Sequence, residues 1–242
     1  MRQIEGRNPV YEAIQAGTRL QEVYIKRGTQ KGKIYKVLEA VREKNISISE
    51  VDISHLDQIS QTGNHQGVIA VAADYHYYHL EELLSSARQE ENPLFLILDH
   101  IQDPHNLGSI LRTADAAGVT GVIFPERRAA QPSPLVNRIA AGAMEHLCLI
   151  RVKNIARTIE LLKKELIWIC GAESTAEKTC YEAQLARPLA LVIGNEGYGL
   201  SRLVGERCDF HVTLPMLGKL ESLNAGVAAA ILLYEAVRQR YY

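Results

Sequence analysis

The sequence lacks the features of membrane, secreted and metal-binding proteins. No apolar run approaches the about 18 residues that cross a bilayer as a helix, and residues 1–7 contain no apolar stretch typical of a signal peptide. The few cysteines form no C-x-x-C pair, which argues against a zinc site or a disulfide framework and favours a reducing cytoplasm. Nucleophile signatures such as G-x-S-x-G, the P-loop and metal-ligand spacings are also missing. We therefore expect a cytoplasmic protein without a metal ion.

The composition is that of an ordinary folded protein. The 242 residues are 47% hydrophobic and 23% charged, which excludes a disordered or collagen-like chain and favours two domains. The formal net charge of −1 is unlike that of most nucleic-acid binders. Between residues 19 and 44, however, basic residues greatly outnumber glutamates, so this segment either contacts a phosphate backbone or forms a solvated helix face. Its basic residues are Arg19, Lys26, Arg27, Lys31, Lys33, Lys36, Arg42 and Lys44.

Residues 1–75 predict a small α/β domain. A helix is expected to begin at Asn8-Pro9, with Pro9 at its first position. Residues 76–93 are polar and are interpreted as a linker, whose two histidines are too few for a metal site. In this first part we expect a second helix at 31–43 and strands at 22–26, 46–49 and 67–72.

Residues 94–242 alternate strand and helix signals more regularly. Continuous apolar strands such as 189–193 imply burial on both faces, and hence a mostly parallel sheet. Ligands of such sheets bind beyond the carboxyl ends of the strands. The expected strands are 94–99, 121–124, 147–152, 167–171, 189–194 and 210–214, and the expected helices are 106–117, 134–144, 154–165, 199–206 and 222–239.

Two helix starts in this second part carry polar residues that a core does not require. Asn106 is expected to cap the helix that follows the first of these strands, with Arg112 opposite its apolar stripe. Ser222 is expected to cap the long last helix, whose N-terminus would suit an anion. Gly226 lies in the first turns of that helix at a cost of about 1 kcal/mol relative to alanine, which indicates a close approach or a tolerant position.

A third segment is the glycine-containing loop at 194–199. Its G-x-x-G-x-G order differs from the G-x-G-x-x-G order of dinucleotide-binding folds, and Leu214 stands where such a fold needs an acid. Taken singly, each of the three segments is also explained as an ordinary cap or turn.

Together, the three segments resemble the motifs of the SpoU (TrmH) branch of the SPOUT RNA 2′-O-methyltransferases. The motifs N-x-G-x-x-x-R-T-A, G-x-E-x-x-G and P-M-x-G-x-x-x-S-L-N occur in family order at 106–114, 194–199 and 215–224. One departure is Gly226, which stands where the family often has a second serine, so any role of that hydroxyl is absent here.

The N-terminal part resembles a substrate-binding domain. Residues 5–10 (E-G-R-N-P-V) and 64–68 (N-H-Q-G-V) resemble the substrate-binding domain of the 23S rRNA guanosine-2′-O-methyltransferase subgroup. That domain is similar to small ribosomal proteins that bind kinked RNA. This resemblance favours RNA contact over a solvated face for the basic segment 19–44.

The resemblance implies a fold, a cofactor and a reaction. The fold is α/β, with a parallel sheet and a deep trefoil knot in residues 94–242, and the cofactor is S-adenosyl-L-methionine bound in a bent form. The reaction is methyl transfer to a ribose 2′-hydroxyl, for which the N-terminal domain favours a guanosine of 23S rRNA. A tRNA ribose, a different rRNA site such as a resistance methylation, and a non-catalytic RNA-binding module are the alternatives.

The resemblance also implies a homodimer in which the partner completes each site, and it assigns residue roles. The small and apolar residues at 225–233 agree with burial in a dimer or in the monomer core. The family proposal makes Arg112 the base, but a guanidinium does not normally deprotonate in proteins, so we expect a mainly electrostatic role in which Asn106 and Glu196 orient Arg112. The implied catalytic residues are Asn106, Arg112, Glu196, Ser222 and Asn224, and the implied cofactor-binding residues are Gly194, Leu214, Met216 and Leu223.

Overall fold

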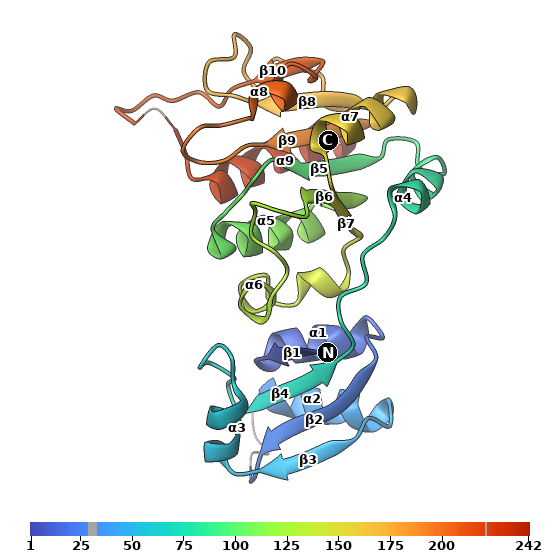
Figure 1. Cartoon of the computed structure of the whole chain (residues 1–242), viewed down its shortest axis with the longest axis vertical. Coiled ribbons are helices and arrows are strands. Elements are labelled where there is room, and N and C mark those ends of the chain that lie inside the picture. The colour runs from blue at the N-terminus through green and yellow to red at the C-terminus, as the bar shows by residue number, and fades with distance from the viewer. Residues whose placement is uncertain (29–32, 221) are drawn as a thin grey trace. The chain divides into compact units, whose positions relative to one another are not determined.

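The computed structural model describes residues 1–28, 33–220 and 222–242. Lys31, which belongs to the basic segment and to the helix predicted at 31–43, lies outside the described residues, as does the side chain of Lys33. The chain forms two compact units, one of Met1–His76 with Pro132–His146 and one of Tyr77–Gln131 with Leu147–Tyr242 (Figure 1). None of the helices in these ranges combines the length and the apolar character that crossing a bilayer requires.

The larger unit is built on a six-stranded sheet in the order β10-β8-β9-β5-β6-β7. Every neighbouring pair is parallel, which confirms the prediction made from the apolar strands. All five residues of each of the central strands β5 and β9 are buried, because helices cover both faces of the sheet. The strands are β5 (Leu94–Leu98), β6 (Gly121–Pro125), β7 (Leu149–Val152), β8 (Trp168–Ala172), β9 (Leu189–Ile193) and β10 (Phe210–Val212).

The helices of this unit pack against the sheet and against one another. Figure 1 shows α5 and α9 side by side, and α9 also contacts β9, while α7 contacts β8 and α8. The chain runs from β5 through β6 to β7 and then crosses to the other side of β5, so the strand order reverses next to β5 and β9. Such a reversal is where ligands of open parallel sheets bind. The helices are α4 (Leu80–Ala87), α5 (Pro104–Ala116), α7 (Ile155–Lys164), α8 (Arg202–Gly205) and α9 (Ala225–Tyr241).

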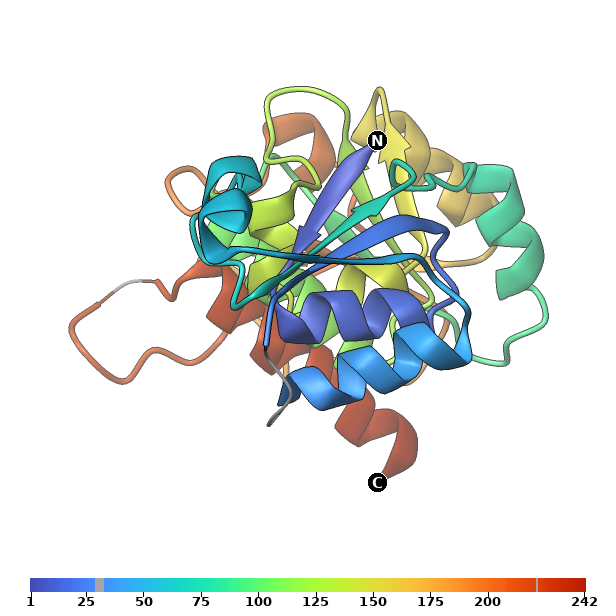
Figure 2. The ribbon, with the colours of Figure 1, turned by 90° about the horizontal axis from the view of Figure 1, so that it is seen from below.

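The smaller unit contains a four-stranded sheet in the order β1-β4-β2-β3, in which only β2 and β3 are parallel. Figure 2 shows α1 and α2 side by side along this sheet, and their apolar faces form one core with it. The strands are β1 (Arg2–Glu5), β2 (Leu20–Lys26), β3 (Ile48–Val51) and β4 (Val68–Ala72), and the helices are α1 (Arg7–Gln15), α2 (Lys33–Glu43), α3 (Ile53–Ile59), α6 (Pro134–Ile139) and the 3₁₀ turn η1 (Ala143–Glu145).

Two helix predictions in the smaller unit are wrong in detail. Helix α1 begins at Arg7 after Gly6, whose φ of 99° suits glycine, so Pro9 is not the first helical residue. The single helix predicted at 134–144 is instead α6 followed by η1, because Ala141 and Gly142 both have positive φ, at 56° and 97°. Strand β1 and helix α3 were not predicted.

A buried ion pair holds the segment Pro132–His146 within the smaller unit. The Arg2 guanidinium donates hydrogen bonds of 2.7 and 2.6 Å to the two carboxylate oxygens of Glu145 and lies 3.7 Å from the centre of the Tyr75 ring. Glu145 also accepts hydrogen bonds from Thr18 and Asn137. A segment that follows β6 in sequence therefore belongs to the unit that contains the N-terminus, although its residues lie in the range interpreted as the second domain.

The first residue of the E-G-R-N-P-V motif is a buried carboxylate. Glu5 is 1% exposed and accepts hydrogen bonds from the Ser60 hydroxyl, the Gln61 amide, and both the amide and the hydroxyl of Thr62. Burial raises the pKa of Glu5, but these hydrogen bonds together lower it by more than burial raises it, so the pKa lies below its ordinary value. Glu5 thus fixes the loop that follows α3.

We predict that Glu5→Gln destabilises the protein by about 2 kcal/mol at neutral pH, because an amide cannot accept all of these hydrogen bonds. The native carboxylate contributes stability above the unfolded pKa of about 4.3, and this contribution is lost as the pH falls through the lower folded pKa. Urea unfolding of both proteins from pH 7 to pH 3 should show the difference shrinking at acid pH. Glu43→Gln, at an exposed position of α2, is the control, and a difference that does not change with pH would contradict this role of Glu5.

Candidate active site

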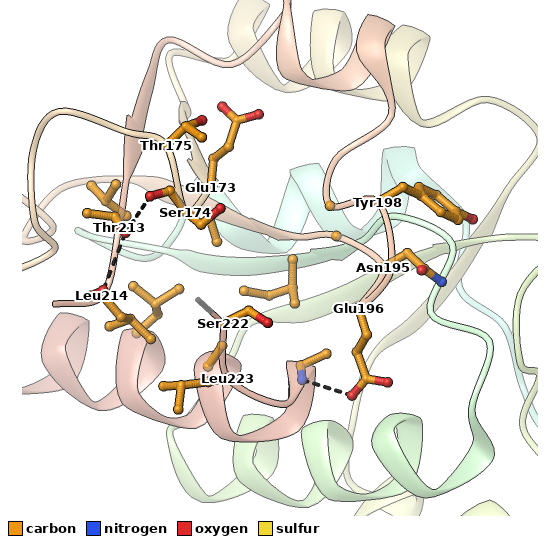
Figure 3. Close-up of a pocket in the computed structure, with 18 of the residues that line it drawn as sticks. Glu173, Ser174, Thr175, Asn195, Glu196, Tyr198, Thr213, Leu214, Ser222 and Leu223 are labelled. Atoms are coloured by element: carbon orange, nitrogen blue, oxygen red, sulfur yellow. Dashed lines mark hydrogen bonds between the residues drawn. The ribbon is translucent and has the colours of Figure 1, made fainter. Parts of the chain in front are cut away.

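A pocket of about 480 Å³ lies beyond the carboxyl ends of β8, β9 and β10. Its lining combines polar residues at the strand ends, such as Glu173 and Asn195, with apolar side chains from the loop before α9 (Figure 3). The volume and the mixed lining are typical of a small-molecule site. Most of the predicted site residues line it, namely Gly194, Glu196, Leu214, Met216, Ser222 and Leu223.

Asn224 links three separate segments at the edge of this pocket. Its side-chain oxygen accepts hydrogen bonds from the Gly226 and Val227 amides, so Asn224 is the N-cap of α9. The prediction that Ser222 caps this helix is therefore wrong, since the cap lies two residues later than expected and the helix begins at Ala225. The amide nitrogen of Asn224 donates to Asn106 over 2.8 Å and to Glu196 over 2.6 Å.

Glu196 extends from the loop after β9 to the start of α9. One of its carboxylate oxygens accepts a hydrogen bond of 3.1 Å from the Ala225 amide (Figure 3) and another from the Asn224 side chain. A carboxylate at a helix N-terminus is stabilised by the helix dipole and by the amides that have no partner within the helix. The predicted acid is thus held by α9, while its other oxygen accepts none of the hydrogen bonds found among the described residues.

Asn106 lies inside the first turn of α5 and does not cap it. The helix begins at Pro104, and Asp103 is the N-cap, since its side chain accepts a hydrogen bond from the His105 amide. The expected cap at Asn106 is wrong because the Asp-Pro pair starts the helix earlier. Asn106 is 5% exposed and turns its side-chain oxygen to Asn224.

Gly194 permits the loop after β9 to fold back on itself. A Cβ atom at this position would lie 2.3 Å from the backbone carbonyl carbon of Gly199, which no side chain tolerates. Asn195 and Gly199 exchange two backbone hydrogen bonds across this turn. The glycine therefore shapes the pocket wall directly.

Arg112 stands apart from the other predicted catalytic residues. It is exposed on α5 and is not among the residues that line the pocket. Within the described residues it makes no hydrogen bond or ion pair, so neither Asn106 nor Glu196 orients it in a single chain. The structure thus brings Asn106, Glu196 and Asn224 together by hydrogen bonds, places Ser222 at the pocket, and leaves Arg112 outside.

The sequence reasoning missed a group of polar residues after β8. Glu173, Ser174 and Thr175 line the pocket opposite α9 (Figure 3). The available signal was their position directly after a predicted strand, at the edge of the sheet where ligands bind. In the part of the chain that the structure describes, no group of His, Cys, Asp and Glu side chains could hold a metal ion.

Gly226 marks a close approach between α5 and α9. A Cβ atom there would lie 2.4 Å from the Ser109 hydroxyl oxygen, which itself donates to the Asn106 carbonyl. A serine in place of Gly226 would require Ser109 to move. Gly226, the residue that departs from the family motif, therefore lies against a hydroxyl group that α5 supplies.

We predict that Gly226→Ala and Ser109→Ala are coupled in their effects on stability. Alanine normally stabilises a helix relative to glycine by about 1 kcal/mol, but here its methyl group meets the Ser109 hydroxyl. Gly226→Ala should therefore be more favourable, by about 1 kcal/mol or more, in the Ser109→Ala protein, where the nearest remaining side-chain atom of residue 109 is 3.5 Å away. Urea unfolding of the wild type, the two single variants and the double variant measures the interaction energy between the two substitutions. Additive effects would rule out the close contact.

Comparisons with known proteins agree with this geometry. Residues 93–234 match the SpoU rRNA Methylase family, and residues 3–78 match the RNA 2′-O ribose methyltransferase substrate binding family. A protein from Bacillus subtilis named as a TrmH family tRNA/rRNA methyltransferase is 45% identical over 97% of this chain and 94% of its own length.

Solved structures give the same result. The SpoU methyltransferase AviRb from Streptomyces viridochromogenes, in complex with the cofactor AdoMet, has a TM-score of 0.83 at 27% identity and covers 98% of this chain and 90% of its own. A structure described as an RNA 2′-O ribose methyltransferase has a TM-score of 0.82 at 29% identity, covering 99% of this chain and 89% of its own. The chain belongs to the SpoU family of S-adenosylmethionine-dependent RNA methyltransferases.

Proposed function

We propose that this protein methylates the ribose 2′-hydroxyl of a guanosine in 23S rRNA and acts as a homodimer in the cytoplasm. The match of residues 3–78 to a substrate-binding family and the motif that begins at Glu5 support an rRNA substrate. All five of the implied catalytic residues are present, and Asn106, Glu196 and Asn224 among them form one hydrogen-bonded network. This argues against a non-catalytic RNA-binding module. The trefoil knot implied by the family resemblance stays a prediction.

The pocket beyond β8, β9 and β10 is suited to S-adenosylmethionine. Its strand ends offer backbone groups for the polar parts of the cofactor, and Leu214, Met216 and Leu223 supply apolar cover. Gly194 keeps the loop close enough to form one wall. When bound, the cofactor supplies an electrophilic methyl group.

We assign the catalytic network a positioning role. Asn224 and Glu196 fix the start of α9 beside the pocket, and Asn106 fixes Asn224. Ser222, which lines the pocket and is exposed, is placed to orient the ribose. Holding the hydroxyl in line with the reacting group lowers the barrier because orientation is established before the reaction.

The exposed position of Arg112 supports a site shared between two copies. Helix α9 also exposes apolar surface, with Val227 at 47% and Tyr234 at 51%. A dimer through the catalytic units would bury this surface and carry Arg112 to the partner's pocket. There its guanidinium would bind an RNA phosphate and stabilise the negative charge that develops on the 2′-oxygen.

We predict that deleting the gene removes one 2′-O-methylguanosine from 23S rRNA. Mapping 2′-O-methyl stops on rRNA and tRNA from the deletion strain identifies the lost position. Transfer of tritiated methyl groups to the same RNA should vanish when the target 2′-hydroxyl is absent. A mark lost from tRNA instead would overturn the 23S assignment, and label retained on deoxyribose would overturn ribose methylation.

We predict that Arg112→Lys lowers the single-turnover rate of methyl transfer by about 10²–10³-fold. Lysine keeps the charge but loses the planar fork that binds phosphate with two hydrogen bonds. If Arg112 acts electrostatically, the apparent pKa of the pH–rate profile should stay the same. An apparent pKa that moves with the substituted side chain would show that residue 112 is the base.

A further inference from the structure

A second pocket, of about 600 Å³, lies beyond the carboxyl ends of β5, β6 and β7. It shares no lining residue with the cofactor pocket. Three of the residues that line it are cationic, Arg127 and Arg128 after β6 and Lys153 after β7, and all three are exposed. The reaction described above assigns no role to any of them.

The charge of this basic pocket is not neutralised by the protein. Arg127, Arg128 and Lys153 make no ion pair or hydrogen bond within the described residues, and Glu126 is the one acidic residue in the lining. The start of α7 adjoins the pocket through Asn154, whose side chain caps the helix, so the positive end of the helix dipole adds to the potential. The pocket is therefore suited to an anion, and its paired arginines to a phosphate group.

His100 is held at this pocket in a strained conformation. Its φ of 61° is unusual for a residue other than glycine. Its Nδ1 lies 2.6 Å from a carboxylate oxygen of Asp99, which is 1% exposed and whose other oxygen accepts from the Ser201 amide. Backbone strain of this kind is characteristic of functional sites. The buried carboxylate engages Nδ1, and Nε2 has no hydrogen-bond partner among the residues that the structure describes.

One loop forms a wall of both pockets. Asn195, Glu196 and Gly197 line the cofactor pocket, and Ser201 lines the basic pocket. Asn195 also donates a hydrogen bond of 3.0 Å to the His100 carbonyl oxygen. A polymer whose reacting ribose lies at the cofactor pocket can therefore continue across this loop to the basic pocket.

We propose that the basic pocket binds a backbone phosphate of the substrate RNA, outside the nucleotide that is methylated. This inference rests on the proposed function, because it takes the anion to be part of the RNA that the enzyme methylates. Arg127 and Arg128 bind the phosphate, and Lys153 together with the start of α7 contributes the remaining positive potential. A free mononucleotide carries the same phosphate chemistry and is distinguished by experiment.

The test measures RNA binding and does not depend on methyl transfer. Unmodified transcripts of 23S rRNA and of tRNA are bound to the wild type, to Lys153→Gln and to Arg127→Gln/Arg128→Gln over a range of salt concentrations. Each lost phosphate contact should reduce the slope of log K against log salt by about 0.7–0.9. The arginine double variant should bind RNA at least about tenfold more weakly, while its Kd for S-adenosylmethionine, measured by calorimetry, stays the same.

Lys164→Gln is the matched control, because Lys164 lies exposed at the other end of α7 and its loss changes the net charge by the same amount as Lys153→Gln. RNA affinities and salt slopes of the pocket variants equal to those of this control would overturn the proposal. Tight binding of AMP that these variants lose, without any change in RNA affinity, would assign the pocket to a mononucleotide and would also overturn it. If the wild type binds RNA but methylates neither transcript, the proposed function fails separately, since the binding measurement remains valid.

Discussion

The side-chain amide of Asn224 is the contact on which the site depends. Its oxygen caps α9, and its nitrogen donates to Asn106 on α5 and to Glu196 on the loop after β9. Rotating the amide by half a turn would place its nitrogen against the helix amides and its oxygen against the two acceptors. One orientation alone satisfies every partner, so the capped helix and the assembled motifs form together.

Close backbone approach is the second constraint. Gly226 brings the start of α9 against Ser109, and Gly194 brings the ends of its own loop together. A Cβ atom would collide with the Ser109 hydroxyl at the first position and with the Gly199 backbone at the second, although the first turn of a helix and a strand end would ordinarily accept a side chain. The glycines therefore serve the geometry of the site at some cost in local conformational entropy.

The sequence predicts the features of this protein that depend on local pattern. Burial of β5 and β9 follows from their apolar runs, and so does the parallel sheet. The identity of the capping residue does not follow, since Asp103, Asn106, Ser222 and Asn224 are all good caps and tertiary partners select among them. The place of Pro132–His146 depends on the buried pair of Arg2 and Glu145, which is separated by most of the sequence. The basic pocket was not predicted because its cations come from two different loops.

The loop after β9 connects the two pockets. Glu196 ties it to α9 on one side, while Asn195 and Ser201 tie it to Asp99 and His100 on the other. Asp99 is buried and the backbone of His100 is held away from its preferred region, so this second attachment cannot shift without losing hydrogen bonds. A ligand that contacts this loop at one pocket therefore touches the same segment that forms a wall of the other. By thermodynamic linkage, any gain in RNA affinity that cofactor binding produces through this loop equals the gain in cofactor affinity that RNA produces.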